Sequence, residues 1–94
     1  MIAMDLPEQR IVVHHRICER HPDVTEDDVR TAWRNQIERR KREGLHPPQY
    51  AAVGFDAKGR LLQIVVVYDP LNDVVFAFHA MKATWSMLNE LGLA

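Results

Sequence analysis

Three of the chain's five histidines and its only cysteine occur within residues 12–21. If this segment is helical, His14, Cys18 and His21 project from one helix face, because they are four and then three residues apart. Imidazole and thiolate suit zinc, but no fourth ligand has an evident position. Two other interpretations stay open: the three side chains pack in or beside the core, or His14 or His21 lines the edge of a functional cleft. We favour packing, and we predict no metal site and no cofactor.

A second group that could do chemistry, Arg60, His79 and Lys82, lies in the C-terminal half of the chain. Three segments there are rich in β-branched and aromatic residues and are separated by the turn-forming sequences DAKG and DPLN: 50–55, 60–68 and 73–79. Short connections of this kind predict an antiparallel three-stranded meander. If Phe55 pairs with Arg60, the first strand ends where the second begins, and His79 to Lys82 reach the same end of the sheet. Two cations and an imidazole at one place would suit a phosphate.

The same register sorts the strand residues onto two faces. One face is predicted to be the core: Ala51, Val53, Phe55, Leu62, Ile64, Val66, Tyr68, Phe76 and Phe78. The other face is shallower and carries Gln63 and His79. We expect this second face either to accept a ligand or to lie beneath the C-terminal helix.

Helical patterns surround the predicted strands. The sequence DLPE at 5–8 is typical of a capping box and predicts a helix over 6–21, after a possible short edge strand at 1–4. Thr25 with Asp28 caps a second predicted helix, whose apolar spacing extends it to about Arg42. Met81, Trp85, Leu88 and Leu91 predict a short terminal helix that ends at Gly92. The fold class is therefore α+β, with two N-terminal helices packed on an antiparallel sheet of three to four strands, a short C-terminal helix, and one domain over 1–94.

The overall charge is close to neutral, with a formal net charge of −1 at pH 7. The basic residues are concentrated: residues 29–48 contain six Lys or Arg and two acids, an excess that can attract anions. The sequence has no run of 18 apolar residues, so no membrane span is predicted. The N-terminus lacks a signal-peptide pattern. A single cysteine excludes an internal disulfide. We expect a cytoplasmic protein without membrane contact.

Several short motifs resemble one family. The sequences GRLLQIVVV and FHAMKATWSMLNELGL, together with ERHPDVTEDDVRTAW, resemble BrnT-like toxins, which are small members of the RelE superfamily of toxin–antitoxin ribonucleases. Gly59, Arg60 and Leu61 match the family's Gly-Arg-Leu, and Lys82, Ala83 and Thr84 match its Lys-Ala-Thr. The matching motifs cover about two thirds of the chain, and they imply a RelE-like fold.

The resemblance implies a metal-independent endoribonuclease in which a 2′-hydroxyl attacks the adjacent phosphate. His79 would act as base or acid, while Arg60 and Lys82 would stabilise the phosphorane. The expected RNA-binding residues are Arg39, Arg40, Lys41, Arg42, Tyr50 and Gln63. Expected partners are RNA, free or on the ribosome, and a cognate antitoxin, and two copies are expected to be able to associate through a sheet edge. The alternative is a non-catalytic RelE-like module that only binds a partner protein.

Overall fold

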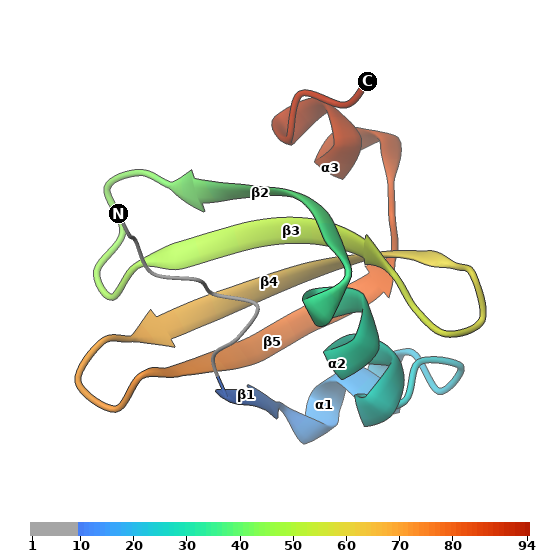
Figure 1. Ribbon diagram of the computed structural model, residues 1–94, viewed down its shortest axis with the longest axis horizontal. Coiled ribbons are helices and arrows are strands. Elements are labelled where there is room, and N and C mark those ends of the chain that lie inside the picture. The colour runs from blue at the N-terminus through green and yellow to red at the C-terminus, as the bar shows by residue number, and fades with distance from the viewer. Residues whose placement is uncertain (1–9) are drawn as a thin grey trace.

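A computed structural model describes residues 10–94, which form a five-stranded mixed sheet and three helices (Figure 1). The strands are β1 (Arg10–Val13), β2 (Gln36–Arg42), β3 (Gln49–Phe55), β4 (Leu61–Asp69) and β5 (Val74–Lys82). The helices are α1 (His15–Arg20), α2 (Glu26–Arg34) and α3 (Trp85–Glu90). The strand order is β1-β5-β4-β3-β2, with β1 parallel to β5 and the other neighbours antiparallel. The predicted α+β class and the β3-β4-β5 meander are confirmed, although the sheet has more strands than predicted.

The second predicted helix is correct at its start and wrong at its end. Thr25 and Asp28 form the expected capping box, with the Thr25 hydroxyl accepting from the Asp28 N–H at 3.1 Å and the Asp28 carboxylate accepting from the Thr25 N–H at 2.9 Å. The helix ends at Arg34, and residues 36–42 form β2 at the sheet edge. Charged residues are common on edge strands, where they discourage pairing with other chains. Pairing with β3 therefore overrides the helical propensity of these residues.

The first predicted helix is also largely replaced. Residues 10–13 pair with β5 as a parallel strand, and only His15–Arg20 are helical. The sequence RIVV is short and apolar, and periodicity alone does not separate a strand from a helix at this length. The predicted capping box at 5–8 and the predicted edge strand at 1–4 lie outside the described residues. Among residues 10–94 no helix is long and apolar enough to cross a membrane.

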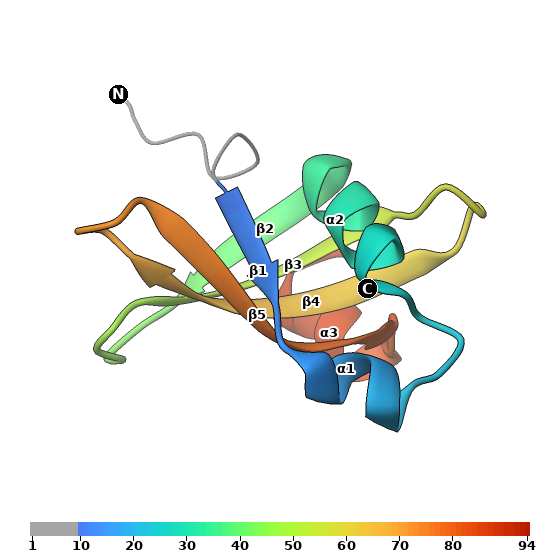
Figure 2. The same cartoon turned by 90° about the horizontal axis from the view of Figure 1, so that it is seen from below.

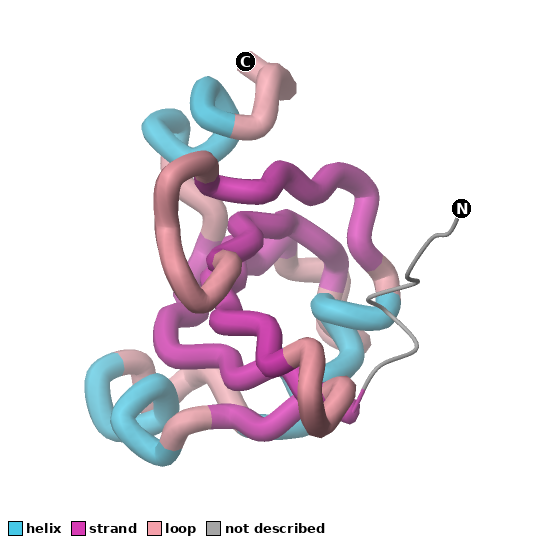
Figure 3. Tube along the Cα trace, turned by 90° about the vertical axis from the view of Figure 1, so that its left-hand side faces the viewer, coloured by secondary structure: helices cyan, strands magenta, loops and turns pink. Residues whose placement is uncertain are grey.

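The two faces of the sheet carry different helices. Figure 2 shows α2 and α3 on opposite faces, and Figure 3 shows α1 on the same side as α3. The larger core lies under α2, where Trp33 packs with Leu62, Ile64 and Val66. Gly54 of β3 allows this close approach, because a Cβ there would collide with the Ala32 carbonyl of α2. The smaller core lies under α3 and joins Met87 and Leu91 to Ala51, Val53 and Val65.

The predicted register was wrong by one residue. Phe55 pairs with Leu61 instead of Arg60, and a shift of one residue moves a whole strand's side chains to the other face. Ala51 and Val53 therefore share the α3 face with Gln63 and Val65, while the predicted core members Leu62, Ile64, Val66 and Tyr68 do lie under α2. The remaining predicted core residues, Phe55, Phe76 and Phe78, are each more than 40% exposed.

A β-bulge interrupts the pairing of β4 with β5. Val65 pairs with His79 and Val66 with Ala77, so that Phe78 is the extra residue of β5. A bulge of this kind directs two successive side chains toward the same side of the strand. Phe78 and His79 both line hollows on the α3 face, which agrees with this geometry.

Candidate functional site

Arg60 is enclosed by carboxylates. Its Nε donates to Asp56 at 2.8 Å, Nη2 donates to Asp28 at 3.0 Å and Nη1 donates to Asp23 at 3.2 Å. The Asp56 side chain has no exposed surface, and the Arg60 side chain is 20% exposed. Since three anions already surround this guanidinium, its role is to fasten the β3–β4 turn to the start of α2.

The predicted corner of Arg60, His79 and Lys82 is not formed. Lys82 pairs with Leu62, and His79 pairs with Val65. Directly opposed residues share a face, so Lys82 lies on the α2 side and His79 on the α3 side. Arg60 also reaches the α2 side, because Asp28 belongs to α2. The expectation that these three groups meet is therefore wrong, because strand alternation places His79 on the opposite face of the sheet from Arg60 and Lys82.

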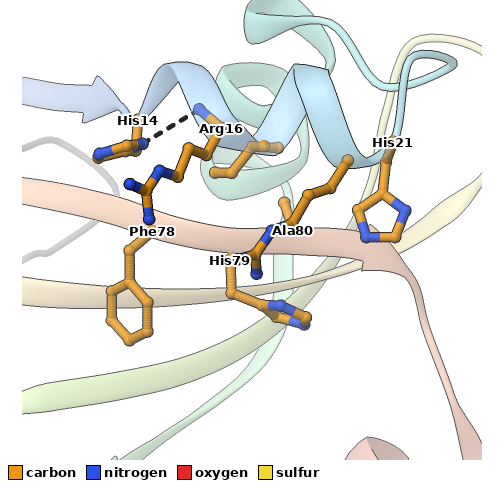
Figure 4. A pocket seen from close by; sticks show the side chains of 8 residues that line it. His14, Arg16, His21, Phe78, His79 and Ala80 are labelled. Atoms are coloured by element: carbon orange, nitrogen blue, oxygen red, sulfur yellow. Dashed lines mark hydrogen bonds between the residues drawn. The ribbon is translucent and has the colours of Figure 1, made fainter.

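His79 lies instead in a groove between α1 and α3, which we call the His79 groove. It consists of two adjoining hollows of about 340 and 410 Å³, which share Arg20, Phe78 and His79. The first is lined also by His14, Arg16, Ile17, His21 and Ala80. The second is lined also by Arg42, Gln63, Val65, Thr84, Ser86, Met87 and Glu90. Figure 4 shows Arg16 and His21 on α1 and its C-terminal end, beside Phe78 and His79 of β5.

Hydrogen bonds fix the tautomer of His79. The Gln63 Oε1 accepts from the Thr84 N–H at 2.8 Å and from the Thr84 hydroxyl at 3.0 Å, so the Gln63 amide nitrogen is the group that faces the imidazole. That nitrogen lies 2.9 Å from His79 Nε2. Because an amide N–H only donates, Nε2 must accept, and the neutral ring carries its proton on Nδ1. The groove therefore contains an oriented imidazole with an N–H donor at Nδ1.

The surroundings also keep His79 neutral. Burial lowers the pKa of His79 below its ordinary value of 6.5, and electrostatic interactions with His21, Arg42 and Arg20 lower it further. Burial and neighbouring cations both disfavour the imidazolium form. At pH 7 the ring is consequently a neutral hydrogen-bonding group.

The cations of the groove differ in how fully they are paired. Arg42 makes two hydrogen bonds to Glu90, from Nε at 2.8 Å and from Nη2 at 2.9 Å. Among residues 10–94, Arg16 and Arg20 form no ion pair with a carboxylate. These two guanidinium groups of α1 are therefore available to an anionic ligand, whereas Arg42 mainly fastens α3 to the sheet edge.

The predicted RNA-binding residues are divided between the two faces. Arg40 and Arg42 pair with Ala51 and Gln49 and lie on the α3 side, whereas Arg39 and Lys41 pair with Ala52 and Tyr50 on the α2 side. Arg40 donates to the Glu90 carbonyl at 3.0 Å. Tyr50 packs against the larger core. Of the predicted site residues, the structure brings together Arg42, Gln63 and His79.

The sequence interpretation missed Arg16, Arg20 and Thr84. Arg20 is the last residue of α1, and no periodic pattern distinguished it from other surface cations. The suggestion that His14 or His21 lines a cleft edge agrees with the groove. The zinc alternative lacks its geometric basis, because His14 caps α1 and His21 follows its end. The part of the chain that the structure describes contains no group of three or more His, Cys, Asp or Glu placed to hold a metal ion.

The chain was compared with known proteins at three levels. No family model, no curated protein and no solved structure matches it.

Proposed function

We propose that the protein binds single-stranded RNA in the His79 groove and cleaves it as a toxin-type, metal-independent endoribonuclease. The observation that carries the proposal is an oriented, neutral imidazole in a groove that also holds two further imidazoles, those of His14 and His21. The same groove holds two guanidinium groups, which have no ion-pair partner among residues 10–94. Guanidinium groups suit phosphate binding, and imidazole suits proton transfer near pH 7. The guanidinium groups and the imidazoles line the same hollow of the groove.

Four residues of the groove would have distinct roles in cleavage. Arg16 and Arg20 hold the phosphate that is attacked. The His79 Nδ1–H donates to a non-bridging oxygen as charge develops there, a role that suits a neutral, oriented donor. His21 accepts the 2′-hydroxyl proton as the 2′-oxygen bonds to phosphorus, and the 5′-oxygen leaves with a proton from solvent. The products are a 2′,3′-cyclic phosphate and a free 5′-hydroxyl.

The experiment is cleavage of a labelled single-stranded RNA by purified protein in excess EDTA. His21→Ala should reduce the rate by about 10²- to 10⁴-fold, the usual contribution of a general base. The matched control is His46→Ala, which removes an exposed imidazole that lines none of the hollows. An RNA left intact by the wild-type protein, or an equal loss in both variants, would refute the catalytic proposal.

A second candidate is the non-catalytic module that binds a partner protein. It is favoured by the exposed apolar residues Val12, Phe76 and Phe78 beside the groove. Induced expression in bacteria separates the two candidates: growth arrest with shortened transcripts supports the ribonuclease, and normal growth with intact transcripts supports the module. In the first case the antitoxin is proposed to neutralise the protein by covering the groove. Association of two copies through β1 or β2, the edge strands of the described sheet, stays a prediction.

A further inference from the structure

The α3 face of the sheet is only half covered. α3 packs over Ala51, Val53 and Val65, which are buried. Toward the other ends of the strands, Val12 is 41% exposed and Phe76 and Phe78 are each 43% exposed. A hollow of about 390 Å³ lies over this area and is lined also by His14, Gln49, Val67 and Ala77. We call the exposed surface of Val12, Val67, Phe76 and Phe78 the aromatic platform.

The aromatic platform is continuous with the His79 groove. Its hollow shares His14 and Phe78 with the hollow between α1 and β5. The bulge in β5 places Phe78 and His79 on one side of the strand, and Phe76 lies two residues earlier. A ligand on the platform can therefore contact both phenyl rings and extend through the shared hollow to His79.

The charges around the platform select the ligand. Three hollows share Phe78, and among residues 10–94 two of them have no carboxylate in their lining. The third contains Glu90, which is hydrogen-bonded to Arg42. Arg16 and Arg20 border the hollow beside α1 without ion-pair partners among residues 10–94. A ligand with planar apolar groups on an anionic backbone complements this combination. Single-stranded nucleic acid has that chemistry, since its bases stack on aromatic side chains while cations follow its phosphates.

We propose that Phe76 and Phe78 stack two bases of single-stranded RNA next to the phosphate held by Arg16 and Arg20. This inference builds on the proposed function, because it names the subsite that recognises the substrate. Base-paired RNA would bind poorly, because its bases are already stacked on one another and their faces are not accessible. The platform therefore selects single strands.

The test measures binding apart from cleavage. The probe is a fluorescein-labelled 2′-O-methyl RNA octamer, which lacks the nucleophilic hydroxyl and stays intact, and the readout is fluorescence anisotropy. Phe76→Ala and Phe78→Ala should each weaken binding by about 5- to 150-fold, the range for loss of one base–aromatic contact. Phe78→Tyr should bind within about threefold of wild type, because it keeps the ring. Phe78→Leu should bind as weakly as the alanine variant.

The matched control is Phe55→Ala. Phe55 is 45% exposed, which is similar to Phe78, but it lines neither the platform nor the groove. A duplex of the same sequence should bind more weakly than the single strand. Binding of the octamer that depends on the phenyl rings supports the platform even if the protein does not cleave RNA. The two proposals can therefore fail separately, one in the binding assay and the other in the cleavage assay.

Three results would overturn the platform. The first is unchanged octamer binding in both phenylalanine-to-alanine variants, even if these variants still cleave RNA. The second is full binding by Phe78→Leu, which would show that apolar area rather than stacking matters. The third is Phe78-dependent binding of an acidic amphipathic peptide by a protein that does not bind the octamer, which would make this surface a protein-docking site.

Discussion

Replacing Asp56 with Asn tests whether the cluster around Arg60 stabilises the fold. The Asp56 Oδ1 accepts from the backbone N–H groups of Lys58 at 2.9 Å and of Arg60 at 2.8 Å, and Oδ2 accepts from Arg60 Nε at 2.8 Å. An asparagine can keep the first two bonds, but its N–H₂ group would then face the Nε–H. Loss of one charge-assisted bond in a buried site costs about 1.5–3 kcal/mol, so Asp56→Asn should lower Tm by about 6–24 °C.

Asp23→Asn is the matched control for this prediction. Asp23 contacts the same guanidinium at 3.2 Å, but its side chain is 60% exposed. Exposed pairs contribute about 0–1 kcal/mol, so this variant should remain close to wild type. The fluorescence of Trp33, which is fully buried, reports unfolding. Heating gives the Tm of each variant, and urea denaturation gives its free energy of unfolding. Equal stability losses in the two variants would contradict the assignment of Asp56 as the central anion of the cluster.

The pH dependence of the same variant provides an independent check. Burial by itself would raise the pKa of Asp56, but the N–H groups of Arg60 and Lys58 and the guanidinium outweigh it, and the pKa lies below its ordinary value. A carboxylate with a lowered folded-state pKa stabilises the fold above the unfolded pKa of about 3.9, and this contribution disappears as the pH falls through the folded-state value. The difference in stability between wild type and Asp56→Asn should therefore be constant from pH 5 to 7 and shrink below about pH 4. A difference that grows under acid would contradict this assignment.

Three other predictions concern the core, the groove and α3. Gly54→Ala should destabilise the protein by about 1–3 kcal/mol in urea, because the new methyl group meets the Ala32 carbonyl; a midpoint equal to wild type would exclude that close contact. Gln63→Ala should raise the pKa of His79 measured by NMR titration, because the amide N–H bonds only the neutral ring, whereas a lower value would mean that the tautomer is assigned wrongly. Glu90→Gln should cost about 0.5–1 kcal/mol at pH 7, because its guanidinium partner is a third exposed. The pKa of Glu90 is lowered chiefly by the hydrogen bonds from Arg42, against the effect of burial. The cost should therefore be constant above the unfolded pKa of about 4.3 and shrink as the pH falls through the lower folded-state value.

The features predicted correctly from sequence were those fixed by neighbouring residues. Thr25 and Asp28 lie three positions apart, so one local motif specified the start of α2. The meander was predictable because β3, β4 and β5 are joined by short turns. The end of α2 depended on β3, whose hydrogen bonds recruit residues 36–42 as a strand, and no signal within that basic segment indicated the pairing.

The site was predicted less well because it depends on the face of the sheet to which each strand side chain points. His79 and Gln63 were assigned to one face, and they do meet there at 2.9 Å. Arg60 was placed beside them because its position at a strand end was known but its partners were not. Asp23 and Asp28 come from segments more than thirty residues away, and only the folded arrangement shows that they neutralise Arg60.

The extra residue in β5 has an implication for how this surface tolerates insertions and deletions. In an uninterrupted strand, residues 76 and 78 would point one way and residue 79 the other, so a phenyl ring and the adjacent imidazole would never share a solvent-facing side. Loss of the extra residue Phe78 would restore simple alternation and keep Ala77 under α2 and Phe76 and His79 on the other face, so the hydrophobic interior could still close while the phenyl ring beside the imidazole would be gone. Small length changes within β5 should therefore alter ligand recognition more than they alter foldability.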